Sequence, residues 1–220
     1  MEHATTIYFT PVTVNSIKAR LLVNALEIPV QFEHIILHQS DAKPEEFLRL
    51  NPAGKVPLLV DGEMVLTESN AILKYLANKH QSTLWPKKQD QQAQVLKWMF
   101  FQSGEWNKNI GIFAHRRVVL PHWGFHQQSL LTPEHLQNFY HSMNQLNDAL
   151  EGRNYLVGNN VSIADISLGS YLMFAHESQM PLENMVNVRR WLSHLQKKSW
   201  WQETQVSLKY TLSTSENIPA

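Results

Sequence analysis

The amino-acid sequence predicts two units: an α/β unit with the element order βαβαββα, followed by an all-helical unit. Three observations support this prediction. Short β-rich runs alternate with helical patterns through residues 5–50. A hairpin with an Asp-Gly turn and a further helix follow in residues 56–80. Beyond residue 90 the apolar residues recur at helical spacing, so the pattern becomes helical.

The α/β unit opens with a β-rich run at residues 5–9, the expected first strand. A loop then leads to a helix at residues 16–27, which Pro29 ends. Residues 30–37 alternate as a second strand, and Pro44 with two acidic residues starts a short helix. This order is the arrangement of a thioredoxin-like domain, with parallel pairing of the first two strands and a right-handed crossover.

The stretch from residue 51 to residue 80 combines a special turn, a hairpin and a helix start. Pro57 opens the first strand of the hairpin, and its X-Pro bond is a candidate for the cis form. A cis bond there presents the backbone of Val56 to a ligand. Glu68 and Ser69 then open a helix whose free amides suit a carboxylate.

A short polar segment at residues 82–89 is the predicted linker, with domains at residues 1–81 and 90–220. In the second domain we expect one long aromatic-rich helix to about residue 115, then helices from residue 132, at residues 162–178 and at residues 189–197. Ser162 and Asp165 have capping-box spacing, which favours a structural role for both. The polar tail after Lys209 is expected to be loosely held.

Composition excludes several classes of protein. The 19 basic and 19 acidic residues balance, so neither nucleic-acid binding nor a membrane surface is indicated. No apolar run approaches the length of a membrane span and no signal peptide is recognised, so we expect a soluble cytoplasmic protein. The absence of cysteine excludes disulfides and every mechanism that needs a protein thiol.

One long stretch carries a specific resemblance: its residues read NPAGKVPLLVDGEMVLTESNAILKYLA. It resembles the glutathione-binding half of the cytosolic glutathione S-transferase family, and the chain is similar to bacterial, theta/phi-like members of the serine/threonine type. The resemblance implies a cis Pro57, backbone pairing of Val56 with the cysteinyl unit, and Lys55 near the glycine end of glutathione. It also implies that Glu68 and Ser69 hold the γ-glutamyl group.

Glutathione transfer requires a thiolate, which a hydroxyl donor and a helix N-terminus can stabilise. Bacterial relatives resemble Ser-Gly-Asn-x-x-Lys-Val-Arg in the first loop, and aligning Asn15, Lys18 and Arg20 puts Thr13 on the serine position. We therefore rank Thr13 first as the donor, Asn15 second and Ser16 third. Thr10 is a further rival in this loop, and Tyr8 at the end of the first strand is an outside candidate.

The electrophile pocket is expected between the domains, against the first long helix. An aromatic stripe at helical spacing is more often core, and that reading stays open for these residues. His122 and His126 could suggest a metal, but no third ligand is evident, so we expect no metal. The candidates for the electrophile pocket are Trp106, Ile110, Phe113 and Arg116.

The resemblance implies a homodimeric detoxification enzyme, with glutathione as co-substrate, that conjugates the glutathione thiolate to small hydrophobic electrophiles. Two alternatives remain open. One is a non-catalytic glutathione-binding or regulatory protein with the same fold, since threonine replaces serine in the first loop. The other is a glutathione-dependent peroxidase, which would use the same thiolate.

Overall fold

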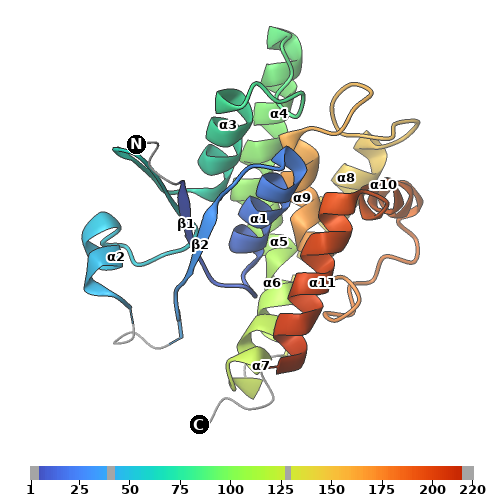
Figure 1. Ribbon diagram of the computed structural model, residues 1–220. Helices are drawn as coiled ribbons and strands as arrows, with labels where there is room; N and C mark the ends of the chain where they lie inside the picture. The colour runs from blue at the N-terminus through green and yellow to red at the C-terminus, as the bar shows by residue number, and fades with distance from the viewer. Residues whose placement is uncertain (1–4, 39–42, 127–129, 215–220) are drawn as a thin grey trace.

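The computed structural model describes residues 5–38, 43–126 and 130–214 of the chain. Its N-terminal part has the predicted βαβαββα order, and its C-terminal part consists of helices, so the predicted fold class is confirmed (Figure 1). The elements of the first part are β1 (Thr6–Phe9), α1 (Val14–Leu26), β2 (Gln31–His34), α2 (Glu45–Leu50), β3 (Leu58–Asp61), β4 (Met64–Leu66) and α3 (Ser69–Lys79).

The four strands form one mixed sheet in the order β2-β1-β3-β4. β1 pairs with β2 in parallel, as predicted, whereas β3 is antiparallel to both β1 and β4. Side chains alternate across the sheet: Ile7 and Leu59 belong to the main core, while Tyr8 and Leu58 join a smaller cluster on the other face. Phe47 of α2 covers that smaller cluster, and α2 lies apart from the other helices (Figure 1).

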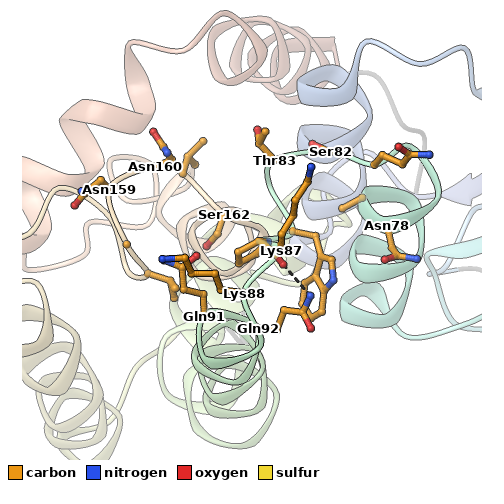
Figure 2. Close-up of a pocket in the computed structure, with 17 residues that line it drawn as sticks. Asn78, Ser82, Thr83, Lys87, Lys88, Gln91, Gln92, Asn159, Asn160 and Ser162 are labelled. Carbon is orange, nitrogen blue, oxygen red and sulfur yellow. Dashed lines mark hydrogen bonds between the residues drawn. The ribbon is translucent and has the colours of Figure 1, made fainter.

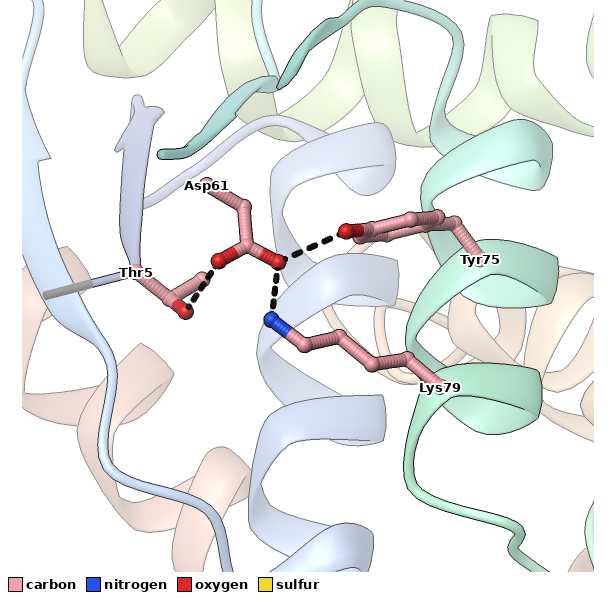
Figure 3. Close-up of polar contacts among 4 residues, drawn as sticks. All are labelled: Thr5, Asp61, Tyr75 and Lys79. Carbon is pink, nitrogen blue, oxygen red and sulfur yellow. Dashed lines mark hydrogen bonds and ion pairs between the residues drawn. The ribbon is translucent and has the colours of Figure 1, made fainter. Parts of the chain in front are cut away.

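A polar cluster ties β1, β3 and α3 together (Figure 3). Asp61 at the end of β3 accepts hydrogen bonds from Thr5 Oγ1 at 3.2 Å and Tyr75 OH at 2.8 Å, and it forms an ion pair with Lys79. Burial alone would raise the pKa of Asp61, but these donors outweigh it and lower the pKa. The carboxylate therefore stays charged and joins the sheet to the helix that follows the hairpin.

The second part is helical. The predicted long helix is interrupted twice by π turns, η2 and η3, each of which shifts the following side chains around the helix axis. Every residue of α9 is buried, so this helix forms the centre of the bundle. The elements are α4 (Gln89–Phe101), η2 (Gln102–Trp106), α5 (Asn107–Asn109), α6 (Gly111–Ala114), η3 (His115–Val119), α7 (Leu120–His122), α8 (Pro133–Ala149), α9 (Ile163–Leu172), α10 (Val186–Gln196) and α11 (Ser199–Thr214).

α11 continues beyond Lys209 to Thr214, and none of its residues after Leu208 is buried, so the loosely held tail stays a prediction. This helix packs along α1 (Figure 1). Two adjacent tryptophans near its start are buried. Thr204 Oγ1 accepts a hydrogen bond from Asn24 Nδ2 at 3.0 Å, which anchors α11 on the α/β part. The many polar side chains of α11 made this packing difficult to predict from the sequence. Residues 215–220 lie outside the described part of the chain.

The predicted capping box at the start of α9 is confirmed. The fully buried carboxylate of Asp165 accepts hydrogen bonds from the backbone N–H of Ser162 at 2.8 Å and of Leu156 at 2.9 Å. Trp191 Nε1 donates to the same carboxylate at 2.9 Å, which joins α9 to α10. The cap therefore also fixes a loop and a second helix.

α3 ends at Lys79 and α4 begins at Gln89, and the domain boundary expected at residues 82–89 stays a prediction. Leu84 in this segment is buried, and its carbonyl accepts a hydrogen bond from the backbone N–H of Ile163 at 2.9 Å. Among the described helices, none combines the length and apolar character needed to cross a membrane.

Candidate functional site

The first loop turns from β1 into α1 through a compact set of hydroxyl contacts. Thr13 is the N-cap residue of α1 but makes no capping hydrogen bond with its side chain. Its hydroxyl lies 3.1 Å from the Thr10 carbonyl and 2.8 Å from Ser16 Oγ, and its single proton can serve one acceptor at a time. Ser16 is fully buried and accepts a hydrogen bond from the Thr10 backbone N–H at 3.1 Å. Ser16 therefore supports the loop from inside, whereas Thr13 is only partly buried.

Asn15 connects this loop to the start of α3. Its Oδ1 accepts a hydrogen bond from Ser69 Oγ at 3.2 Å, which leaves the Nδ2 group as a donor. The backbone N–H groups of the first turn of α1 have no acceptor within the helix, so this end carries a partial positive charge. A donor side chain and a helix N-terminus thus meet at one point.

The Val56–Pro57 peptide bond is cis, as predicted, and directly precedes β3. Asn51 Nδ2 donates to the Lys55 carbonyl at 2.7 Å, which holds the turn before this bond. Glu68 has φ 65° and ψ 108°, a conformation that residues with side chains rarely adopt. Backbone strain of this kind clusters at functional sites. Ile72 N–H donates to the Glu68 carbonyl at 3.0 Å, so α3 begins directly after this residue.

These elements line two neighbouring cavities. The first measures about 530 Å³ and is lined on the α/β side by Thr13, Asn15, Lys55 and Val56, among others. The second measures about 590 Å³ and contains Glu68 and the first residues of α3 in its wall. Asn15 and Asn107 line both cavities, so the start of α1 and the start of α3 face two cavities that meet at these side chains.

The residues predicted for the electrophile pocket do not line these two cavities. Trp106, Ile110 and Phe113 are fully buried in the main core and are absent from the wall of either cavity. Arg116 donates through Nη1 to the Leu130 carbonyl at 2.6 Å and also lies outside both walls. The reading of the aromatic stripe as core therefore fits the observed packing.

The helical wall of the first cavity consists of residues from α5, α6 and η3, the residue after α7, and Tyr171 of α9. Most of these residues were not predicted from the sequence, because the aromatic positions favoured another side of the helix. The sequence does contain a signal for this wall: Asn107, Gly111 and His115 are small or polar and lie four residues apart, which places them on one side of a helix. The residues of this wall are Asn107, Lys108, Gly111, Ile112, His115, Val119, Trp123 and Tyr171.

Gly111 allows close packing where this wall meets α9. A Cβ added at Gly111 would lie 3.0 Å from Cε1 of Tyr171, a contact that one of the two residues would have to relieve. Gln102 Nε2 donates to the Tyr171 hydroxyl at 2.6 Å, and that hydroxyl donates to Asn107 Oδ1 at 2.8 Å. Tyr171 thereby connects the buried polar network behind α3 to the cavity wall.

Another cavity, of about 610 Å³, lies between the end of α3, the start of α4 and residues 157–162 (Figure 2). Amide side chains and two lysines surround it, and Gln92 Nε2 donates to the Pro86 carbonyl at 2.8 Å. It shares no lining residue with the two adjoining cavities. Because the first loop, the cis turn and the start of α3 are all absent from its wall, we assign the candidate site to the adjoining pair.

Two other possibilities raised by the sequence are Tyr8 as the hydroxyl donor and a metal ion held by His122 and His126. Tyr8 packs against the ring of Phe47 with centroids 5.5 Å apart, on the face of the sheet that carries the smaller cluster. Within residues 5–38, 43–126 and 130–214, no three histidine or acidic side chains gather in a way that could hold a metal ion.

Known proteins with similar sequences carry one family name. The family model of the glutathione S-transferase N-terminal domain matches residues 4–78. Glutathione S-transferase F10 of Arabidopsis thaliana is 27% identical over 201 residues, which cover 88% of this chain and 93% of the relative. Residues 4–78 therefore match the glutathione S-transferase N-terminal domain family, and the chain as a whole is similar to glutathione S-transferases. Relatives with that name support glutathione transfer as its general activity.

Solved structures show the same similarity. The structure described as a possible glutathione S-transferase from Rhodopseudomonas palustris is 28% identical, with a TM-score of 0.77 and coverage of 90% of this chain and 96% of that one. The glutathione transferase homologue from Drosophila mojavensis, at 21% identity, shares the fold, with a TM-score of 0.82 and coverage of 98% of both chains. Matches from a plant, a bacterium and an insect leave the expected bacterial subtype a prediction.

Proposed function

We propose that this chain is a glutathione transferase that joins the thiolate of glutathione to small hydrophobic electrophiles. One observation carries the proposal: two cavities that share Asn15 and Asn107 are lined by the start of α1, the cis Val56–Pro57 turn and the Glu68–Ser69 pair. The homologue from Drosophila mojavensis, which has the same fold, has glutathione bound in its structure.

The tripeptide would lie along the elements that the resemblance assigned to it. The backbone of Val56, exposed by the cis bond to Pro57, pairs with the cysteinyl unit, and Lys55 reaches the glycine end. Glu68 binds the γ-glutamyl amine, and Ser69 with the free amides of α3 binds its carboxylate. The 11-residue length of α3 supports this role, because a helix of several turns presents an aligned dipole to the anion.

Catalysis requires the thiol of glutathione to lose its proton near neutral pH, and a free thiol has a pKa of about 8.5. We propose Thr13 as the hydrogen-bond donor to the sulfur. Its hydroxyl makes no capping hydrogen bond to α1 and can rotate from the Thr10 carbonyl toward the sulfur. The N-terminus of α1 supplies further stabilisation of the anion. The thiol proton passes to solvent, sulfur forms a bond to the electrophilic carbon, and the leaving group departs with its electron pair. Asn15 is the alternative donor.

The electrophile would bind in the first cavity, against the apolar side chains of Ile112, Val119 and Trp123. Trp123 stacks on His38 with ring centroids 5.6 Å apart, which positions the indole at this wall. Lys108 also lines the cavity and would favour an electrophile that develops negative charge.

A binding protein without turnover is the second candidate function. The contacts of the Thr13 hydroxyl with the Thr10 carbonyl and Ser16 Oγ favour it, because a hydroxyl engaged within the loop gives no hydrogen bond to sulfur. Glutathione would then bind through Glu68 and Ser69 as before, but its thiol would keep its ordinary pKa.

A homodimer is part of the proposal. Phe100 on α4 is 72% exposed and Met64 on β4 is 44% exposed, and Leu96 is a further exposed apolar residue on α4. Phe100 and Leu96 line the second cavity, so a partner that covers them would also enclose the space beside Glu68.

An ultraviolet difference titration of bound glutathione tests the function directly. We expect thiolate absorbance at least one pH unit below its appearance in free glutathione, and loss of that shift in Thr13→Ala but not in Thr13→Ser. Asn15→Ala is the matched comparison, and loss of the shift there alone would move the donor to Asn15. Bound glutathione that never ionises early would establish the binding protein instead.

A further inference from the structure

A lysine in α1 is buried behind the start of α3. Lys18 has no exposed surface, and its Nζ donates to Ser69 Oγ at 3.1 Å, Asn70 Oδ1 at 3.0 Å and Gln102 Oε1 at 2.7 Å. These three acceptors belong to two further elements, α3 and η2. The ammonium group therefore links α1, the first turn of α3 and the first π turn.

All three acceptors are neutral, so no carboxylate within hydrogen-bond reach balances the charge among the described residues. Burial lowers the pKa of Lys18 to about 7, and the negative charge of the exposed Glu68 opposes this effect. A buried charge without a partner is costly, which makes this site sensitive to any anion that comes near.

The other groups around Lys18 do not supply that anion. On α9, the ring centroid of Tyr171 lies 5.7 Å from Nζ, and burial raises the pKa of Tyr171, which keeps it neutral. The acidic residue of α9, Asp165, is engaged by the α9 cap and Trp191. α11 meets α1 through neutral acceptors, Thr204 and Ser207.

Lys18 lies directly behind the surface that faces the second cavity. Ser69, Asn70 and Gln102 all line this cavity and all accept from Lys18. An anion at the N-terminus of α3 would therefore be separated from the ammonium only by the side chains of that first turn. Its charge would act on Lys18 through a water-poor interior, where electrostatic interactions are strong.

We propose that Lys18 is a positioning residue whose protonation is coupled to the binding of the γ-glutamyl carboxylate at the N-terminus of α3. The inference rests on the proposed function. The bound carboxylate supplies the missing counter-charge, and the ammonium holds Ser69 and Asn70 in place for it. A deprotonated amine keeps two hydrogens for three acceptors, so one acceptor would lose its donor.

The direction of the pH dependence follows from linkage. Binding raises the pKa of Lys18 from about 7, so the complex takes up a proton at any pH between the free and bound values. The affinity is then highest below pH 7 and falls as pH rises. We expect the dissociation constant to increase roughly five- to tenfold between about pH 6 and pH 8.

Calorimetric titration with S-methylglutathione tests this, because the methyl group removes the ionisation of the thiol. The wild-type protein should show the five- to tenfold rise and proton uptake in buffers of different ionisation enthalpy. Lys18→Arg, which keeps the charge and does not titrate here, should bind with a flat profile. Lys18→Gln should bind more weakly at acidic pH, also with a flat profile. Lys209→Gln, at an exposed position on α11, should behave as wild type.

The outcomes separate this inference from the proposed function. Binding that varies less than twofold over this pH range, without proton uptake, overturns the role of Lys18 and leaves glutathione binding intact. A wild-type slope retained in Lys18→Arg has the same consequence. Absence of binding at every pH refutes both. If the Lys18 variants fail to fold, the proton uptake of the wild-type protein on binding tests the role of Lys18 by itself, and its absence overturns that role.

Discussion

Replacing Asp165 by alanine should destabilise the fold far more than removal of an ordinary helix cap. Its carboxylate accepts from the backbone N–H groups of Ser162 and Leu156, from the Ser162 hydroxyl and from Trp191 Nε1, all within 2.9 Å. In the variant the hydroxyl can reorient, but three buried N–H donors lose their acceptor. Each buried donor without a partner costs about 1–3 kcal/mol. Allowing for water that enters the vacated space, we expect a loss of about 3–5 kcal/mol.

The chain contains its own control. α8 begins with a second capping box, in which His135 N–H donates to Thr132 Oγ1 at 3.3 Å and Thr132 N–H donates to His135 Nδ1 at 3.0 Å. This box is exposed, so water can replace the lost partner. Thr132→Ala should therefore cost only about 1 kcal/mol. The difference between the two variants isolates the effect of burial from that of capping.

Urea unfolding followed by tryptophan fluorescence measures both losses, at one fixed protomer concentration because oligomerisation affects apparent stability. Trp191→Phe removes one of the donors to Asp165, and its combination with Asp165→Ala should cost less than the sum of the single variants. If Asp165→Ala loses no more stability than Thr132→Ala, the carboxylate is not the shared acceptor that the structure shows, and the reasoning is refuted.

Two further predictions concern packing and assembly. Gly169→Ala would place Cβ 2.8 Å from Leu195 Cδ1 and 3.3 Å from Trp201 Cζ3, so it should cost about 1–3 kcal/mol in urea unfolding. Gly104→Ala, which meets nothing within 4 Å, should be neutral or stabilising, and equal losses would contradict this assignment. Phe100→Glu, at a 72% exposed position, should shift the molar mass in sedimentation from dimer to monomer without unfolding the chain. A wild-type molar mass in Phe100→Glu would argue against the proposed interface.

Local patterns in the sequence determined much of this protein. The strand and helix order, the cis bond at Val56–Pro57, the helix start after Glu68 and the capping box at Ser162 each depend on residues within a few positions of one another. Turn chemistry, capping and hydrophobic periodicity are short-range effects, so they can be recognised without knowledge of the fold. The same short-range patterns also place Thr13 and Asn15 in the loop between the first strand and the first helix.

Only the tertiary structure decided which side of each helix meets which neighbour. Trp106 and Phe113 lie in the core whereas Asn107 and Gly111 line the cavity, and the π turn η2 directly before Asn107 is a feature that regular helical spacing does not predict. Lys18 is buried because α1 is covered by α3, α9 and α11 together, a long-range arrangement that leaves no trace in neighbouring residues. A local pattern can place a residue on a helix, but only the packing of the whole chain determines what that residue touches.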